Sequence, residues 1–296
     1  MAVQIDRSRI DRVFLTKSVM PLFNATTAAG ISDWPFYTIS RRPASFRIWF
    51  SLSDPHLIGL LRPAIEEHFQ LWLDSELQQK ELRLHYGQPH ELLGEESETR
   101  DVAVRMLHLV SGTCLKCLHY YRHEWNEQLA LQMALQMQMI LLKSFTPLDT
   151  EAVCLLEQLF RNEVRTRTPD WKEMSRMQRI ERIAEWRCQL YERKQRAHHL
   201  LLKQASWLWA QPSPPVPPPL ERFATIAPVL IRSFKEALPA AARQDPDEGL
   251  PSPASWQPLH HFFRHIHNNL LLEEEAALLD FALIPQAIQQ ATSRMS

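Results

Sequence analysis

The residues with the clearest capacity for chemistry are the arginines and lysines of segment 161–203. This segment holds twelve Lys or Arg residues against six Asp or Glu residues, although the whole chain of 296 residues has a formal net charge of −1. A basic helical surface with interleaved aromatic side chains suits an acidic protein partner or a phosphate backbone. The residues expected to bind a partner protein or nucleic acid are Arg161, Arg165, Arg167, Arg176, Arg179, Arg187, Arg193, Lys194, Arg196, Trp207 and Trp209.

The same segment also fits a simpler interpretation, a solvated helix face with internal ion pairs. Several glutamates, such as Glu181 and Glu185, are spaced for pairs along a helix. The acidic run Glu273–Glu275 is a further candidate partner for the basic segment, within this chain or on another copy.

Histidines form the second cluster of chemically active residues, at positions 260, 261, 265 and 267. His261 and His265 are spaced i, i+4 and are weak candidates to share a metal on a helix face. The zinc-protease pattern His-Glu-x-x-His is absent, because position 262 is Phe262. The alternative is an amphipathic helix with histidines at its rim, and we expect no cofactor.

Arg264, in the same run, partly resembles the Arg-x-x-x-x-x-His element of the all-helical HEPN ribonucleases. Positions 269 to 272 contain no histidine, so the element is incomplete. A helical enzyme, metal-dependent or ribonuclease-like and centred on residues 260–268, therefore stays a minor alternative.

The four cysteines of the chain include one close pair, Cys114 and Cys117. A zinc site needs a second such pair, whereas Cys154 and Cys188 are single. The flanks of the close pair look helical rather than like the strand that precedes a redox Cys-x-x-Cys. Buried structural thiols are the favoured interpretation.

Glycine is scarce, with six residues in the chain and none between positions 113 and 248. The patterns G-x-G-x-x-G, G-x-x-x-x-G-K-[ST] and G-x-S-x-G are all missing. Loops that hold phosphate groups depend on the backbone freedom of glycine. The sequence thus disfavours nucleotide-loop chemistry and favours long helices whose faces are the working surfaces.

Composition and charge indicate an ordinary globular protein without a membrane span. The chain is 45% hydrophobic, and its 33 basic and 34 acidic residues nearly cancel. The apolar stretch 129–142 contains three glutamines and is shorter than the ~18 residues of a spanning helix. Charges follow too closely on the first residues for a signal peptide. We expect a cytoplasmic protein with no membrane insertion.

Hydrophobic periodicity predicts helices over most of the chain. We expect them at 5–18, 64–85, 99–145, 149–166, 170–209 and 220–243, with a further helical region that divides near 268–269 and at Pro285. Residues 129–142 are apolar around nearly the whole circumference, which predicts a central core helix. Aromatic and β-branched residues in 34–52 predict a small hairpin.

The predicted fold class is therefore mainly α, a multi-helix bundle with at most a small β-hairpin near residues 34–52 and a smaller C-terminal helical unit. We expect a helical body at 1–210, a proline-rich linker at 211–219 and a C-terminal unit at 220–296. The leading functional hypothesis is a non-enzymatic adaptor or structural subunit that binds proteins of a larger assembly. A nucleic-acid-binding module on the basic face 161–203 is the first alternative. No small-molecule ligand is indicated.

Overall fold

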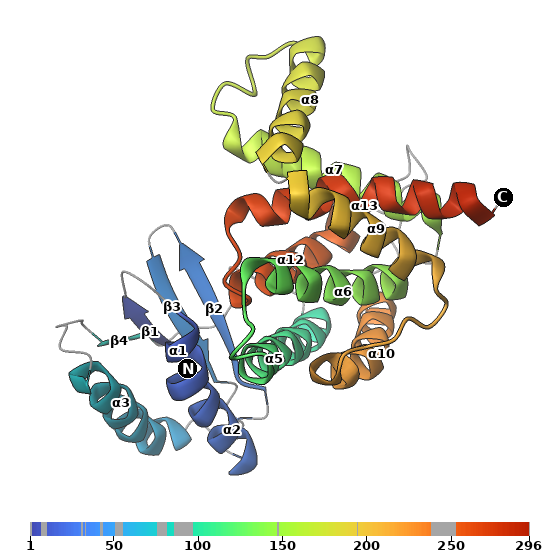
Figure 1. The fold of residues 1–296 in the computed structure, drawn as a ribbon. Helices are drawn as coiled ribbons and strands as arrows, with labels where there is room; N and C mark the ends of the chain where they lie inside the picture. The colour runs from blue at the N-terminus through green and yellow to red at the C-terminus, as the bar shows by residue number, and fades with distance from the viewer. Residues whose placement is uncertain are drawn as a thin grey trace. The chain divides into compact units, whose positions relative to one another are not determined.

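The chain folds into two compact units in a computed structural model (Figure 1). Unit 1 contains residues 1–125 and 268–271, and unit 2 contains residues 126–267 and 272–296. The structure describes residues 2–6, 11–30, 32, 34–41, 44–50, 56–75, 82–85, 97–146, 148–193, 195–237 and 253–295.

A four-stranded antiparallel sheet forms one part of unit 1. The expected hairpin is confirmed as β2 (Phe36–Arg41) and β3 (Ala44–Trp49), with Phe36 opposite Trp49. Two further strands, β1 (Ala2–Asp6) and β4 (Leu82–His85), extend it to the order β2-β3-β1-β4. The helices expected to start at residue 5 and to end at residue 85 were therefore wrong at those ends. Pairing with distant strands decided the conformation there, and local periodicity does not record such pairing.

Alternation along the hairpin explains which face of the sheet is buried. Tyr37, Ile39, Phe46 and Ile48 are buried, whereas the alternate residues Thr38, Arg47 and Trp49 are partly exposed. This period of two places one apolar face on the core of unit 1. Within that core the rings of Phe14 and Phe46 meet edge to face, with centroids 5.1 Å apart.

The helices of unit 1 are short except for α3 and α5. They are α1 (Arg12–Phe14), a π-helical turn (Leu15–Val19), α2 (Met20–Ala28), α3 (Leu57–Ser75) and α5 (Ser97–Tyr120). Pro21 lies in the first turn of α2, where its missing N–H is harmless. A Cβ at Gly112 in α5 would lie 3.5 Å from the Phe23 ring, an ordinary van der Waals distance, so this packing does not require a glycine.

The described part of unit 2 is built from helices and the turns between them. They are α6 (Glu127–Phe145), α7 (Asp149–Arg167), α8 (Arg176–Arg193), α9 (Gln195–Ala210), the 3-10 turn η2 (Pro218–Leu220), α10 (Glu221–Ala237), α12 (Pro253–Asn269) and α13 (Glu274–Met295). Eleven side chains of α6 are buried, which confirms it as a core helix. It packs against α9 and α10, and α13 packs against α7, α8 and α9.

Other helix boundaries also differ from the sequence expectation. The expected helix 99–145 is interrupted, because the side chain of Asn126 accepts a hydrogen bond from Leu129 N at 2.9 Å and caps the start of α6. Conversely, α13 continues through Pro285, where a break was expected. Its neighbours bury both sides of that proline, and tertiary packing offsets the one lost backbone bond.

The mainly helical fold class is confirmed, but the division of the chain differs from the expected boundary at 211–219. Helices α10 and α13 pack on α6, α7 and α9, so they belong to the same unit as most of 126–210. The apolar residues that follow the proline-rich segment 211–219 pack against α6, α7 and α9. They are buried only when α10 and α13 lie in the same unit as those helices. Among the described helices, none is long and apolar enough to cross a membrane.

Candidate functional site

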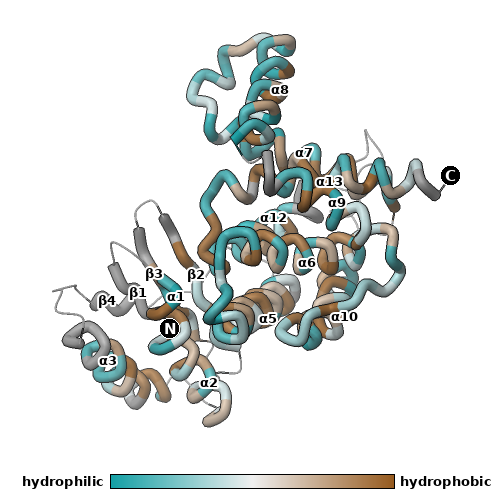
Figure 2. The backbone as a smooth tube through the Cα atoms, in the orientation of Figure 1, coloured by the Kyte–Doolittle hydropathy of each residue, from teal (hydrophilic) through white to brown (hydrophobic). Residues whose placement is uncertain are grey.

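Helix α8 carries the first half of the predicted basic surface and begins at a reciprocal cap. The side chain of Gln178 accepts a hydrogen bond from Ser175 N at 2.8 Å, and Ser175 Oγ accepts one from Gln178 N at 3.3 Å. This Ser-x-x-Gln capping box satisfies two backbone donors at the start of the helix. In Figure 1, α8 stands away from the other helices of unit 2, and Figure 2 shows hydrophilic and hydrophobic segments alternating along it.

A pocket of about 450 Å³ lies between α7 and α8 and brings together four of the predicted arginines. Arg161 comes from α7, and Arg176, Arg179 and Arg187 come from α8. Arg179 and Arg187 follow Arg176 by three and eleven residues, which places the α8 arginines on nearly one helix face. We call this feature the arginine pocket.

The arginine pocket contains one carboxylate, which holds one of its four arginines. Arg187 Nη2 donates to both oxygens of Glu157, at 3.0 and 2.9 Å. Arg179 instead donates to backbone carbonyls, to Trp171 O at 3.1 Å and Lys172 O at 3.2 Å. Within the described residues, no hydrogen bond or ion pair holds the exposed side chains of Arg161 and Arg176. The pocket therefore keeps an excess of positive charge.

The remaining predicted basic residues lie elsewhere. Arg165 is exposed on α7, whereas Arg167 and Arg193 pair with acidic residues of α13. Lys194 lies outside the described residues, and Arg196 is on α9 with no described side chain.

The two tryptophans that were expected to act as a pair differ in exposure, because α9 turns their side chains to different sides. Trp207 is 46% exposed, whereas Trp209 is buried. The ring N–H of Trp209 donates to Asp149 Oδ1 at 3.0 Å. A separation of two residues turns the side chains roughly 200° apart on a helix, so the pair does not form a single surface.

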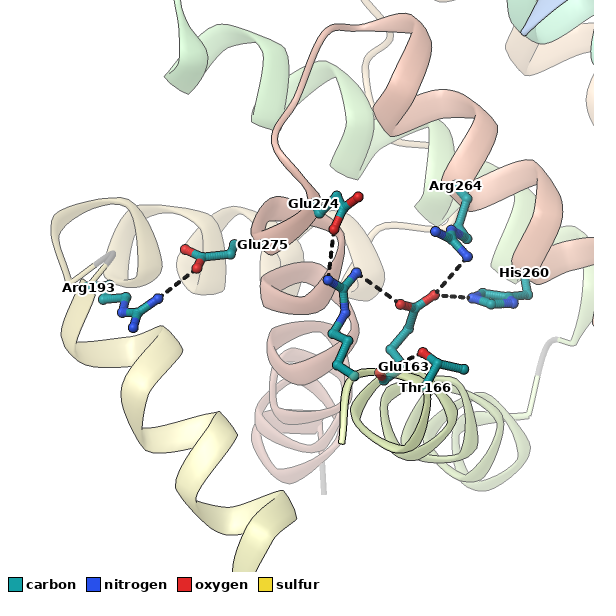
Figure 3. A network of polar contacts seen from close by, with 8 residues as sticks. Glu163, Thr166, Arg193, His260, Arg264, Glu274 and Glu275 are labelled. Atoms are coloured by element: carbon teal, nitrogen blue, oxygen red, sulfur yellow. Dashed lines mark hydrogen bonds and ion pairs between the residues drawn. The ribbon is translucent and has the colours of Figure 1, made fainter. Parts of the chain in front are cut away.

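A buried carboxylate, Glu163 of α7, is the centre of a second polar cluster (Figure 3). Its side chain is 2% exposed, and Oε1 lies 2.7 Å from His260 Nε2 and 3.6 Å from Arg264 Nη1. Arg167 Nη2 lies 3.2 Å from the other oxygen, Oε2. We call these four residues the Glu163 cluster.

The positive surroundings keep Glu163 ionised. Burial by itself raises the pKa of this carboxyl, but the hydrogen bond from His260 and the charges of Arg264, His260 and Arg167 outweigh it. The result is a pKa lowered from 4.5 to about 2. Because an ionised carboxylate only accepts hydrogen bonds, the proton of the shared contact resides on His260 Nε2.

The Glu163 cluster extends to the acidic run that was expected to meet the basic segment. Arg167 Nη1 contacts Glu274 Oε2 at 2.9 Å, and Arg193 Nη1 contacts Glu275 Oε1 at 2.6 Å (Figure 3). The expected docking of 273–275 on the basic helices thus occurs within the chain and joins α13 to α7 and α8.

The other histidines of the 260–267 run do not form a metal site with their neighbours. His265 is 6% exposed, and His261 is half-buried with a pKa lowered by burial and by the nearby His260 and Arg264. His267 Nε2 contacts the buried Asp280 Oδ2 at 2.7 Å. No group of three or more His, Cys, Asp or Glu residues in the described ranges could hold a metal ion.

The close cysteine pair is buried, as expected. Cys114 and Cys117 are buried in α5, whereas Cys154 and Cys188 are exposed. Burial raises the pKa of both buried thiols, that of Cys117 to about 12.

Sequence reasoning missed Glu163 and His260 as a pair. The only local signal was the i, i+4 spacing of Glu163 and Arg167, which is common on solvated helices. His260 and Arg264 come from α12, about a hundred positions later in the chain, so their approach to Glu163 depends on helix packing.

Comparison with known proteins finds likeness in structure but not in sequence. No protein-family model and no curated protein matches the chain. A pyridine synthase, TbtD, from thiomuracin biosynthesis matches over 99% of this chain and 98% of its own, with a TM-score of 0.60 and 13% identity. TsrL matches over 99% and 95%, with a TM-score of 0.57 and 15% identity.

A third match concerns part of a larger protein. The tRNA dependent lantibiotic dehydratase MibB from Microbispora sp. 107891 matches with a TM-score of 0.62 and 15% identity. The match covers 99% of this chain but 28% of that one.

These likenesses overturn the expectation of a non-enzymatic adaptor or complex subunit. That expectation depended on missing glycine-loop motifs, yet the same fold occurs along almost the entire length of a chain named a pyridine synthase. A helical fold can build a site from side chains of packed helices, so the missing loops exclude less than they seemed to.

Proposed function

We propose that this protein is an enzyme that modifies a peptide in the biosynthesis of a peptide natural product. The observation that supports this most is the end-to-end likeness of fold to the pyridine synthase from thiomuracin biosynthesis. The likeness to part of a lantibiotic dehydratase supports the same broad class of reaction. In this proposal the binding partner is a peptide substrate and not the protein assembly expected from the sequence. The proposal also places the protein in the cytoplasm.

Chemistry of this class requires proton transfer, and His260 is the best candidate for it. Elimination of water from a side chain, for example, removes one proton from carbon and delivers another to the leaving group. His260 Nε2–H donates a hydrogen bond to Glu163 Oε1 at 2.7 Å, which leaves Nδ1 as the basic nitrogen when the ring is neutral. The His260 side chain is 16% exposed, so the ring is not sealed in the core.

Glu163 has a positioning role in this proposal. Its lowered pKa makes it a poor base, but a permanent carboxylate orients the imidazole and stabilises the imidazolium that forms when a proton is taken up. Arg264, which is 49% exposed beside the same carboxylate, is available to a negatively charged leaving group.

The test is a mass-spectrometric assay of the purified protein with the precursor peptide encoded beside its gene. We expect a mass change that corresponds to loss of water or to ring closure. His260→Ala should slow it by about 10²–10⁴-fold, the usual contribution of general acid–base catalysis. His199→Ala, which changes an exposed histidine of α9, is the matched control.

The two parts of the proposal fail differently. If the wild-type protein leaves every such peptide unchanged, the enzymatic function is wrong. If His260→Ala modifies the peptide at the wild-type rate, the function stands and the role of His260 is wrong. Thermal unfolding of both variants shows whether a loss of rate comes from a loss of folded protein.

A further inference from the structure

The arginine pocket has features that the proposed reaction does not use. Its positive charge exceeds its negative charge, because Glu157 binds Arg187 while Arg161, Arg176 and Arg179 have no ion pair within the described residues. An arginine guanidinium forms two parallel hydrogen bonds to a carboxylate, so this geometry is suited to acidic side chains.

The pocket also has an apolar wall formed by α8. Ile180, Ile183 and Ala184 line it between the arginines. Ile180 is 51% exposed, and Met177, one residue after Arg176, is 64% exposed. Large apolar side chains that stay uncovered beside a pocket mark a surface that gains free energy when a partner covers it. Charge and apolar area therefore coincide on one face of α8.

Rigid contacts hold the frame of the pocket. The Arg187 guanidinium lies 5.0 Å from the ring centre of Phe160 and also binds Glu157. The Arg179 guanidinium lies 5.7 Å from the Trp171 ring and is tied to the backbone of the loop before α8. Arg161 and Arg176 are then the side chains that can turn towards a ligand without breaking a contact.

We propose that the arginine pocket is a docking site for an acidic segment of the peptide substrate, one that combines Asp or Glu residues with an apolar side chain. This inference rests on the proposed function, since it concerns the same substrate. An apolar side chain fills the space against Ile180 and Ile183, and flanking carboxylates bind Arg161 and Arg176. The volume of about 450 Å³ lies within the roughly 300–1,000 Å³ typical of ligand pockets.

A phosphate backbone fits this surface less well. Nucleic acid would satisfy the arginines, but it would leave Ile180 and Met177 exposed, and Trp171 already lies against Arg179 rather than open for base stacking. The apolar wall therefore favours a peptide.

The docking site is separate from the candidate proton-transfer group. Arg161 and Glu163 are two residues apart on α7, and such residues point about 200° apart around a helix. Binding at the arginine pocket would therefore hold one part of a peptide while another part reacts, and it would raise the local concentration of the reacting part.

The test measures binding alone, by fluorescence anisotropy of a labelled synthetic peptide that combines Glu and Leu residues. We expect the wild-type protein to bind it, with affinity falling as salt rises. The double variant Arg161→Gln/Arg176→Gln should bind at least about tenfold more weakly. Arg165→Gln removes an exposed arginine from α7 outside the pocket and should bind as the wild type does. The same peptide with Gln in place of Glu should bind poorly.

Two results would overturn the inference. One is equal affinity of the double variant and the wild type. The other is displacement of the peptide by a single-stranded oligonucleotide of the same charge at lower concentration than by unlabelled peptide, which would identify phosphate as the ligand. Peptide binding without any mass change in the assay above would contradict the proposed function but not the docking site. A mass change with no effect of the double substitution on affinity would contradict the docking site alone.

Discussion

The Nε2 atom of His260 lies 2.7 Å from the Oε1 atom of Glu163, although the two residues are 97 positions apart in the chain. This contact joins α12 to α7 through a carboxylate that is almost fully buried. Because the Glu163 carboxylate is ionised, the contact fixes which histidine nitrogen carries the proton. The same contact therefore holds two helices of unit 2 together and orients the candidate proton-transfer group.

The first prediction concerns stability in acid. The pKa of Glu163 is about 2 in the folded protein and near 4.5 ordinarily, so the unfolded chain takes up the proton more readily. The stabilisation from Glu163 is complete above about pH 4.5 and is lost as the pH falls towards 2. Its size is on the order of 3 kcal/mol. Chemical denaturation at several pH values should show this loss for the wild type and a flatter profile for Glu163→Gln.

A matched control exists for this experiment. Glu185→Gln removes a carboxylate whose ion pair with Arg182 is on the surface, with side chains 55% and 40% exposed. Surface pairs contribute about 0–1 kcal/mol. If Glu185→Gln flattens the acid profile as strongly as Glu163→Gln does, the loss comes from general charge effects and not from the Glu163 cluster.

The second prediction separates the two neighbouring tryptophans of α9. Trp209→Phe removes the hydrogen bond to Asp149 and should lower the free energy of unfolding by roughly 1–3 kcal/mol, because it leaves a partly buried acceptor unpaired. Trp207→Phe changes an exposed side chain and should stay within about 0.5 kcal/mol of the wild type. Urea unfolding followed by circular dichroism measures both; equal effects would contradict the structure of α9.

The third prediction uses thiol reactivity. Cys154 and Cys188 are exposed, whereas Cys114 and Cys117 are buried and have raised pKa values. The thiolate is the reactive form, so titration of the native protein with a disulfide reagent at neutral pH should modify two thiols quickly and two slowly. In denaturant all four should react at similar rates. Fast reaction of all four in the native state would mean that α5 is not packed as described.

The fourth prediction concerns the end of α9. The ammonium group of Lys143 donates to Leu208 O at 2.9 Å and to Gln211 O at 2.6 Å, where the proline-rich segment begins. Lys143→Met keeps the apolar stem but leaves these carbonyls without that donor, which should cost roughly 1.5–3 kcal/mol of stability. Lys203→Met alters an exposed lysine of α9 and should leave the unfolding midpoint nearly unchanged.

The hydrophobic pattern of the sequence was sufficient to predict those elements in which the pattern is regular from end to end. The apolar circumference of 129–142 predicted a core helix because no face of such a segment is stable in water. The alternating aromatic and β-branched residues of 36–49 predicted the hairpin, since its two strands are neighbours in sequence. The acidic run 273–275 was correctly expected to meet the basic segment, because opposite charges of this density have few other partners.

Local pattern failed where the deciding contact is distant. Residues 2–6 and 82–85 form strands because each pairs with a strand that is far away in sequence, and no periodicity over four or five residues reports that. The inference from missing glycine loops to a non-enzymatic adaptor failed for a related reason. It treated catalysis as a property of local motifs, whereas helical folds assemble sites from separate segments.

The sequence by itself determined that this protein is mainly helical, that α6 is buried, and that an excess of arginines lies between residues 161 and 203. Only the tertiary structure decided which arginines share a pocket and which residues of other helices meet Glu163. Hydrophobic periodicity specifies the face that a helix buries, but the partner of that face depends on how the helices pack. Arg161 and Arg167 are on the same helix, yet they end in different sites. Packing of α8 makes Arg161 part of a pocket, whereas packing of α12 and α13 makes Arg167 part of an ion-pair cluster.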